Sequence, residues 1–202
     1  MSQKRAAAPP REASPCARCA LLLGRSCCQA EAGEPLATLT WADVQRIQAV
    51  THLPQKRFVE EEVLREEEAR AYELLRPGWR GYFRRGTVRL SLARVKGACV
   101  FFESGTGCTL SEEARPTACR LYPFEPTLDG RWTLAVEREG SVGEARASGE
   151  PRCLAVEEAE GRSALLRAFQ TSEEALRALG ERLRAEVRAH GTADSPSGRR
   201  PA

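Results

Sequence analysis

The chain has 202 residues, a length typical of one domain, and its 31 basic and 28 acidic residues give a net charge of +3. So small a positive excess does not indicate a nucleic-acid partner, and no apolar run approaches the roughly 20 residues that span a bilayer. The apolar stretch Ala20 to Leu23 is too short for the core of a signal peptide, which takes about 7–15 residues. We therefore expect a cytoplasmic protein without a nucleic-acid or membrane partner.

The two ends of the chain differ in composition from its middle. Residues 1–14 are rich in alanine, proline and charged residues, and residues 191–202 combine glycine, serine, proline and arginine. Segments of this kind bury little apolar surface and are typically disordered. The sequence therefore predicts one folded domain over residues 15–190 between two disordered tails.

The folded part opens with a dense cysteine cluster, "CARCALLLGRSCC". Cys16 and Cys19 are separated by two residues, the spacing at which a tight turn presents two sulfurs to one ion. Cys27 and Cys28 add two adjacent thiols. Neighbouring cysteines rarely bridge each other, because the Cα atoms of a disulfide lie farther apart than those of adjacent residues. The cluster therefore has the features of a metal-ligand set.

A first helix is predicted over residues 41–51, within "TLTWADVQRIQAVTHL". Thr40 is a favourable N-cap, and Asp43 lies in the first turn, near the positive end of the helix dipole. Val44 and Ile47 recur at helical spacing and give the helix one apolar face.

A second helix is predicted within residues 55–75, "QKRFVEEEVLREEEARAYELL". This segment is rich in good helix formers and is followed by Pro77, which cannot continue a helix. Its acidic blocks, Glu60–Glu62 and Glu66–Glu68, are expected to form a solvated face.

The middle of the chain has the alternating pattern of strands. "GTVRLSLAR" predicts one strand, and "CVFF" and "CTLS", joined by the turn "SGTG", predict a hairpin with Cys99 and Cys108 near its open ends. In "EEARPTACRLYPF" a short helical turn that carries Cys119 is expected between Pro116 and Pro123. A second hairpin is expected around the turn Asp129-Gly130.

The last segment is predicted to be helical. Thr171 and Glu174 have the spacing of a capping box. Four apolar residues at helical spacing form one stripe that we assign to the core: Leu176, Leu179, Leu183 and Val187. With the hairpins in the middle, these helices predict a small α+β domain.

Three kinds of chemistry compete for the eight cysteines. A metal or iron–sulfur site is favoured by their number and spacing. A disulfide framework is disfavoured because the chain shows no secretion signal. A dithiol redox enzyme is disfavoured because Cys16-x-x-Cys19 follows a tail and not the first strand of a βαβ unit.

Thiolate softness restricts which metal these residues can bind. An all-thiolate set suits zinc or an iron–sulfur cluster and disfavours magnesium, calcium and manganese. The two histidines, His52 in a predicted helix and His190 near the tail, are not expected to be ligands. Several arginines lie within four residues of a cysteine and can offset the negative charge of bound thiolates: Arg18, Arg25, Arg115, Arg120 and Arg152.

The order of these motifs resembles the YkgJ-like cysteine-cluster family, whose signature is of the CxxCxxCC type. The resemblance is carried by "CARCALLLGRSCC", by "GACVFFESGTGCTLSEEARPTACRLYPF" and by a late cysteine, and it extends from Cys16 to Cys153. The block "RPTACRLYPF" is its most specific part. The family is described as zinc- or iron-chelating.

The resemblance implies a ligand set and its structural surround. The implied metal ligands are Cys16, Cys19, Cys27, Cys28, Cys99, Cys108, Cys119 and Cys153. The implied surround is Arg115, Pro116, Arg120, Tyr122 and Pro123. Eight thiolates can close two four-thiolate sites, or one cluster with four cysteines to spare. A site with every position filled is structural or electron-transferring, because a catalytic zinc keeps one position open.

Two other functions remain as alternatives at this point. Flagellin lysine methylases carry a similar cysteine signature, which leaves open a cluster-dependent enzyme or accessory subunit. A zinc-dependent nucleic-acid-binding module is the other alternative, although the chain lacks a dense basic stripe with interleaved aromatic residues. No Gly-rich phosphate loop, GxSxG or HExxH motif indicates another reaction.

Overall fold

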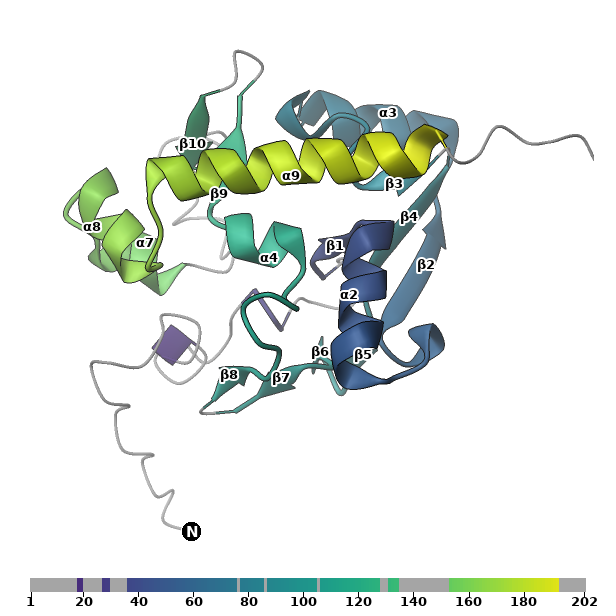
Figure 1. Cartoon of the computed structure of the whole chain (residues 1–202), viewed down its shortest axis with the longest axis horizontal. Coiled ribbons are helices and arrows are strands. Elements are labelled where there is room, and N and C mark those ends of the chain that lie inside the picture. The colour runs from purple at the N-terminus through teal and green to yellow at the C-terminus, as the bar shows by residue number, and fades with distance from the viewer. Residues whose placement is uncertain are drawn as a thin grey trace, which may run out of the picture.

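A computed structural model gives the fold of residues 18–19, 27–29, 36–75, 77–85, 87–104, 106–127, 131–134 and 153–192. Short antiparallel strand pairs and helices make up this part of the chain, so the predicted α+β class is confirmed (Figure 1). The N-terminal tail predicted over residues 1–14 lies outside the described residues. So does the C-terminal tail beyond residue 192.

The largest sheet has a strand at its centre that the alternating pattern predicted. Its strands are β1 (Thr38–Leu39), β2 (Val59–Val63), β3 (Arg84–Arg85) and β4 (Val88–Leu92). The order is β1-β4-β2, with β3 also paired to β4, and every pairing is antiparallel. Strand β4 is buried from Arg89 onward, which is expected of a strand with neighbours on both sides.

The helix predicted within residues 55–75 is correct only in its second half. Helix α3 covers Glu66–Leu75, whereas residues 55–57 form a 3₁₀ turn, η1 (Gln55–Arg57), and residues 59–63 form strand β2. The acidic blocks are exposed, as predicted, but the first of them lies on a strand.

Pairing with β4 explains why an acidic, helix-prone segment is extended. Val59 lies opposite Leu92 and is buried, and Glu62 lies opposite Arg89. The Arg89 Nε donates a 3.0 Å hydrogen bond to the Glu62 carboxylate. These cross-strand contacts are made with residues distant in the sequence, and they outweigh the local helical preference.

Helix α2 (Trp41–Thr51) has the predicted bounds and the predicted N-cap. The backbone N–H of Asp43 donates to the Thr40 hydroxyl at 3.0 Å, and the backbone N–H of Thr40 donates to the Asp43 carboxylate at 2.8 Å. This reciprocal pair is a capping box. The helix ends at its C-cap, His52, whose backbone N–H still bonds the Gln48 carbonyl and whose left-handed φ of 56° turns the chain out of the helix.

The single hairpin predicted around Cys99 and Cys108 is two hairpins in the structure. The first pairs β5 (Arg94–Val95) with β6 (Ala98–Cys99), and the second pairs β7 (Phe102–Glu103) with β8 (Gly107–Cys108). The extra turn is Lys96-Gly97, with φ values of 53° and 82°. Two consecutive positive φ angles make the two-residue turn that closes tight hairpins.

The "RPTACRLYPF" block folds as predicted. Helix α4 covers Thr117–Leu121, directly after Pro116, and ends before Pro123. Strand β9 (Phe124–Pro126) then pairs with β10 (Trp132–Leu134), which confirms the second hairpin. The predicted turn residues Asp129 and Gly130 lie outside the described residues.

Three further helices follow in the described part of the chain: α7 (Leu154–Glu158), α8 (Arg162–Ala168) and α9 (Glu173–Thr192). Helix α9 crosses the molecule with α4 beneath it (Figure 1). Leu176 and Leu183 of the predicted stripe are fully buried. The cap lies one residue later than predicted, because the Ser172 hydroxyl accepts the Ala175 N–H at 3.1 Å.

The apolar side chains form two clusters. One lies between α2 and the main sheet and includes Ile47, Phe58 and Leu90. The other lies around α9 and includes Phe124 and Leu183. The cysteine-bearing segments β6, β8 and α4 lie where the two clusters approach each other.

One glycine of α9 is required by packing. A Cβ at Gly180 would lie 2.6 Å from the Trp132 ring. We expect overpacking in Gly180→Ala to lower the free energy of unfolding by about 1–3 kcal/mol. The higher helix propensity of alanine should restore about 1 kcal/mol of this loss. Urea unfolding measures the change, with Ala185→Gly at an exposed position of α9 as the propensity control. A higher midpoint for Gly180→Ala would contradict the tight packing.

A half-buried ion pair predicts a pH dependence of stability. The Glu73 carboxylate accepts a 2.8 Å hydrogen bond from the Arg84 Nε and a 3.0 Å bond from the Gly81 N–H. The bond from Arg84 is the main reason why the pKa of Glu73 lies below its ordinary value. Its contribution is therefore present above the pKa of the unfolded chain and is lost as the pH falls through the folded pKa.

We expect Glu73→Gln to be less stable than the parent chain at pH 7 and equally stable at the acid end of the titration. Urea unfolding between pH 7 and pH 3 measures this difference. The matched control is Glu67→Gln, at an exposed position of α3. A stability difference that persists unchanged at low pH would show that the charge of Glu73 contributes nothing.

Candidate metal centre

The β5–β6 hairpin brings Cys99 against the N-terminal cysteine cluster. The backbone N–H of Cys99 donates a 2.7 Å hydrogen bond to the carbonyl oxygen of Cys28. This bond joins two cysteines that are far apart in the chain. Burial raises the pKa of the Cys99 thiol to about 12, and the nearby thiols of Cys28 and Cys108 add to the rise.

Cys108 lies at the end of the second hairpin, on β8. Burial raises the pKa of its thiol, whereas a hydrogen bond from the backbone N–H of Leu110 and the nearby Arg115 guanidinium oppose the rise. Arg115 also donates from its Nε to the Leu110 carbonyl at 3.2 Å, which fixes its guanidinium near the cysteine. Arg115 therefore lies where the sequence analysis expected an arginine to offset thiolate charge.

Cys119 is placed by helix α4. Burial raises the pKa of its thiol well above the ordinary value, and the thiols of Cys28, Cys99 and Cys108 raise it further. Without a bound cation these thiols are protonated at neutral pH, because a buried thiolate without a partner is costly.

One cavity of about 520 Å³ collects these side chains. Five of the predicted ligands line it: Cys27, Cys28, Cys99, Cys108 and Cys119. They come from four separate segments of the chain: the N-terminal cluster, β6, β8 and α4. Among the described residues no three metal-binding side chains are already gathered into a coordination sphere, so the thiols face a common space without converging on one point.

Of the other predicted ligands, the described ones are not among the residues that line the cavity. Cys16 is outside the described residues, and Cys19 is buried. Cys153 is the N-cap residue of α7 and packs against the α9 cluster. The guanidinium of Arg18 donates to the Glu158 carboxylate at 2.9 and 3.0 Å, which links the turn of Cys19 to α7.

All seven described cysteines are thiols and none forms a disulfide. His52 caps α2, is exposed and does not line the cavity, and His190 belongs to α9. Of the other arginines, Arg18 pairs with Glu158, and Arg25 and Arg152 are outside the described residues. The donor set of the cavity is therefore dominated by sulfur, which suits zinc or iron and not a hard cation.

Aromatic side chains make up another part of the cavity lining, the aromatic wall, which the cysteine spacing could not predict. It includes Trp79, Phe83, Phe124 and Phe169. The rings of Trp79 and Phe83 lie 5.2 Å apart, and those of Phe124 and Phe169 lie 6.2 Å apart. Phe124 is the last residue of the "RPTACRLYPF" block. This block is therefore the one sequence motif that could have indicated an aromatic residue near the cysteines.

Two buried charged residues also line the cavity. Arg89 of β4 is 8% exposed and Glu125 of β9 is 5% exposed. With Arg115, they give the cavity two basic side chains and one acidic side chain. A bound thiolate centre of negative charge would be partly offset by this surround.

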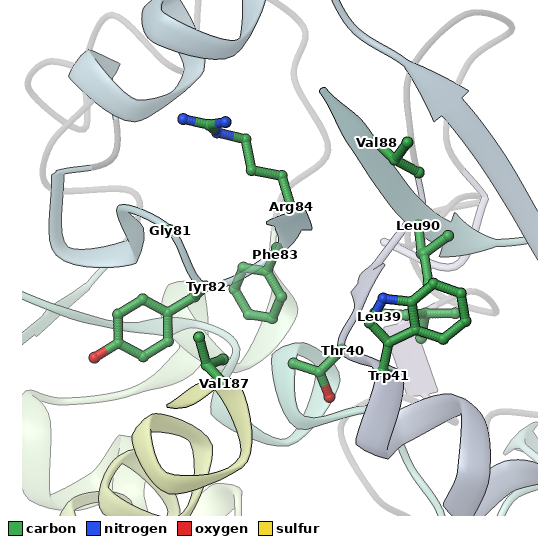
Figure 2. Close-up of a pocket in the computed structure, with 10 residues that line it drawn as sticks. All are labelled: Leu39, Thr40, Trp41, Gly81, Tyr82, Phe83, Arg84, Val88, Leu90 and Val187. Atoms are coloured by element: carbon green, nitrogen blue, oxygen red, sulfur yellow. The ribbon is translucent and has the colours of Figure 1, made fainter. Parts of the chain in front are cut away.

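A second, smaller cavity of about 100 Å³ lies behind the aromatic wall. Figure 2 shows Phe83 and Val187 on one side of it and Trp41 and Leu90 on the other, with the Tyr82 ring directed away from Trp41. No cysteine, histidine or carboxylate lines it in the described part of the chain. Its lining is mostly apolar, so it offers no metal-ligand set.

Comparisons with known proteins agree with the cysteine geometry. Residues 15–146 match the family CxxCxxCC, described as "Putative zinc- or iron-chelating domain". No curated protein and no solved structure matches the chain. Within the described residues no helix has the length and apolar character needed to cross a membrane. Because the match covers well over half of the chain and includes the cysteine-bearing segments that line the cavity, this protein belongs to the CxxCxxCC family.

Proposed function

We propose that the protein binds zinc or iron, as single ions or as an iron–sulfur cluster, through clustered cysteine thiolates. The observation that carries the proposal is the convergence of Cys28, Cys99, Cys108 and Cys119 on one cavity. These four side chains influence one another electrostatically, although they lie on separate elements. We assign them as the first group of ligands.

The donor set fits such a metal centre. Four thiolates on a divalent ion carry a net charge of about −2. Arg89 and Arg115 on the cavity wall would offset that charge. A zinc ion supplies a structural cross-link between the segments that bind it, and an iron–sulfur cluster supplies electron transfer.

The remaining cysteines form a second proposed group: Cys16, Cys19, Cys27 and Cys153. The Arg18–Glu158 ion pair supports it, because the pair links the turn of Cys19 to the helix that begins after Cys153. Cys27 is exposed and also lines the cavity of the first group. Cys153 has no support from the family match, because the match ends at residue 146.

The cavity is larger than a single small ion requires. Its volume of about 520 Å³ is many times the roughly 30 Å³ that one water occupies in the liquid. The cavity can therefore accommodate a multi-atom cluster, or an ion together with another molecule. The aromatic wall favours, as the second candidate function, a cluster-dependent enzyme or accessory subunit in which an organic molecule lies beside the metal.

So many reduced thiols also support a cytoplasmic setting, where disulfides are rare. The experiment that identifies the metal is elemental analysis with an absorption spectrum, on protein purified without oxygen. Iron with sulfide and a broad visible band would establish an iron–sulfur cluster. Zinc at one or two ions per chain without colour would establish thiolate zinc sites. Neither metal above background would contradict the proposed function.

A further inference from the structure

We propose that Asp43 is a positioning residue for the metal centre: its buried carboxylate fixes helix α4, and with it Cys119, against helix α2. The inference rests on the proposed function and names a residue outside the cysteine set. Asp43 has no exposed surface, and its carboxylate is bonded to residues of both helices.

One carboxylate oxygen serves α2 alone. Asp43 Oδ2 accepts the backbone N–H of Thr40 at 2.8 Å and completes the capping box of its own helix. A capping box needs no more than this one oxygen. The second oxygen is therefore available for another role.

That second oxygen bonds α4. Asp43 Oδ1 accepts the backbone N–H of Thr117 at 2.9 Å and the Thr117 hydroxyl at 2.9 Å, across 74 residues of sequence. Thr117 is the first residue of α4, and the preceding Pro116 gives this helix no side-chain cap. Asp43 therefore supplies the cap that α4 lacks, from another helix.

An arginine extends the network to α9. The Arg46 guanidinium bonds the Asp43 carboxylate, and it donates to the Thr117 hydroxyl at 2.9 Å and to Glu186 at 2.6 Å. Because Arg46 contacts Asp43, the buried carboxylate has a cationic partner within the network.

Cys119 lies two residues after Thr117, within the same short helix. A helix of this length has few hydrogen bonds of its own, so its position depends on contacts with the rest of the protein. The network around Asp43 provides those contacts at its N-terminal end. Metal ligands require placement within a few tenths of an ångström, and residues that orient a ligand are known to change metal affinity by 10–100-fold.

The first test measures zinc affinity by competition with a chelator, in reducing buffer, for the full chain and for Asp43→Asn. The substitution keeps the shape of the side chain but replaces one acceptor oxygen by a donor. We expect the Kd for zinc to rise about 10–100-fold. An unchanged Kd would overturn the proposal.

The second test separates positioning from general destabilisation. It measures hydrogen exchange of the metal-free protein at the amides of Arg120 and Tyr122, which donate to α4 and Pro116 carbonyls, and at the amide of Leu92 on β4. Asp43→Asn should lose protection at the α4 amides and keep it on β4. Ile47→Ala, which opens a cavity in α2 without touching the carboxylate, should lose protection across all of them.

Equal loss at α4 and β4 in Asp43→Asn, as in Ile47→Ala, would overturn the proposal. A parent chain that binds neither zinc nor iron would instead contradict the proposed metal centre, while the exchange comparison would still decide whether Asp43 fixes α4. The two failures are therefore distinguishable.

Thr117→Val tests the same contact from its other side. This change removes the hydroxyl and keeps the backbone N–H, so we expect a smaller rise in the zinc Kd than for Asp43→Asn. The double variant should lose little more than Asp43→Asn alone, because both changes break one interaction. Fully additive losses would overturn the direct link between the two residues.

Discussion

Cys119→Ser is expected to lose most of the metal from the cavity and to unfold at a lower temperature than the parent chain. Cys119 is one of the four thiols assigned to the first ligand group, and a serine hydroxyl is a poor substitute for a soft thiolate. The metal Kd should rise by more than about 100-fold, because mutation of residues that only orient a ligand already lowers metal affinity about 10–100-fold.

Stability should fall together with metal content, because binding to the folded state is coupled to folding. Losing a metal present at 100 times its Kd removes about 2.7 kcal/mol of stability, or roughly 5–10 °C in Tm for a chain of this size. Inductively coupled plasma analysis and thermal unfolding measure the two effects on the same samples.

Ala118→Ser is the matched control for this prediction. It adds a hydroxyl to the neighbouring residue of α4, which also lines the cavity, and keeps every thiol. We expect its metal content to equal that of the parent chain. If Cys119→Ser retained full metal content and an unchanged Tm, Cys119 would not be a ligand.

Gly78→Ala is expected to lower the free energy of unfolding by about 3 kcal/mol. This is the largest effect that we predict for adding one methyl group to a glycine. A Cβ at Gly78 would lie 1.7 Å from the backbone carbonyl oxygen of Pro126. Backbone cannot move aside as a side chain can, so η2 (Pro77–Trp79) and β9 would have to separate. Both carry aromatic residues of the cavity wall, Trp79 and Phe124.

Gly97→Ala provides the comparison, because it introduces strain without a clash. Its φ of 82° is unfavourable for alanine, but nothing lies within 4 Å of the added Cβ. We expect a loss of about 1–2 kcal/mol from the left-handed conformation alone. Urea unfolding of both variants checks the order. A smaller loss for Gly78→Ala than for Gly97→Ala would contradict the close contact between η2 and β9.

Elements with local signals were predictable from the sequence. Helix α2 has its bounds because Thr40 and Asp43 cap it through residues three apart, which the sequence displays directly. Helix α4 is similarly enclosed by Pro116 and Pro123. In both cases the determining interactions lie within a few residues of the element.

Elements that depend on distant partners were not predictable in the same way. Strand β2 is extended because Glu62 and Val59 face residues of β4, and no local pattern indicates that pairing. Cys99 and Cys108 lie on separate hairpins because Lys96 takes a positive φ, which is uncommon outside glycine.

The cysteine set itself was predictable, but its grouping was not. Spacing and number indicated thiolate ligands, whereas the assembly of Cys28 with Cys99 depends on a backbone hydrogen bond between distant segments. The capping role of Asp43 was visible in the sequence, and its bond to Thr117 was not. The aromatic wall depends in the same way on η2 and β9 meeting in three dimensions.

X-ray absorption spectroscopy at the zinc or iron edge, on anaerobically purified full-length protein, tests the central claim most directly. Thiolate ligation predicts a first shell of about four sulfur atoms, near 2.3 Å when the metal is zinc. An iron–sulfur cluster would add an iron–iron distance to the sulfur shell. A first shell dominated by nitrogen or oxygen would contradict a centre built from the cysteines of the cavity.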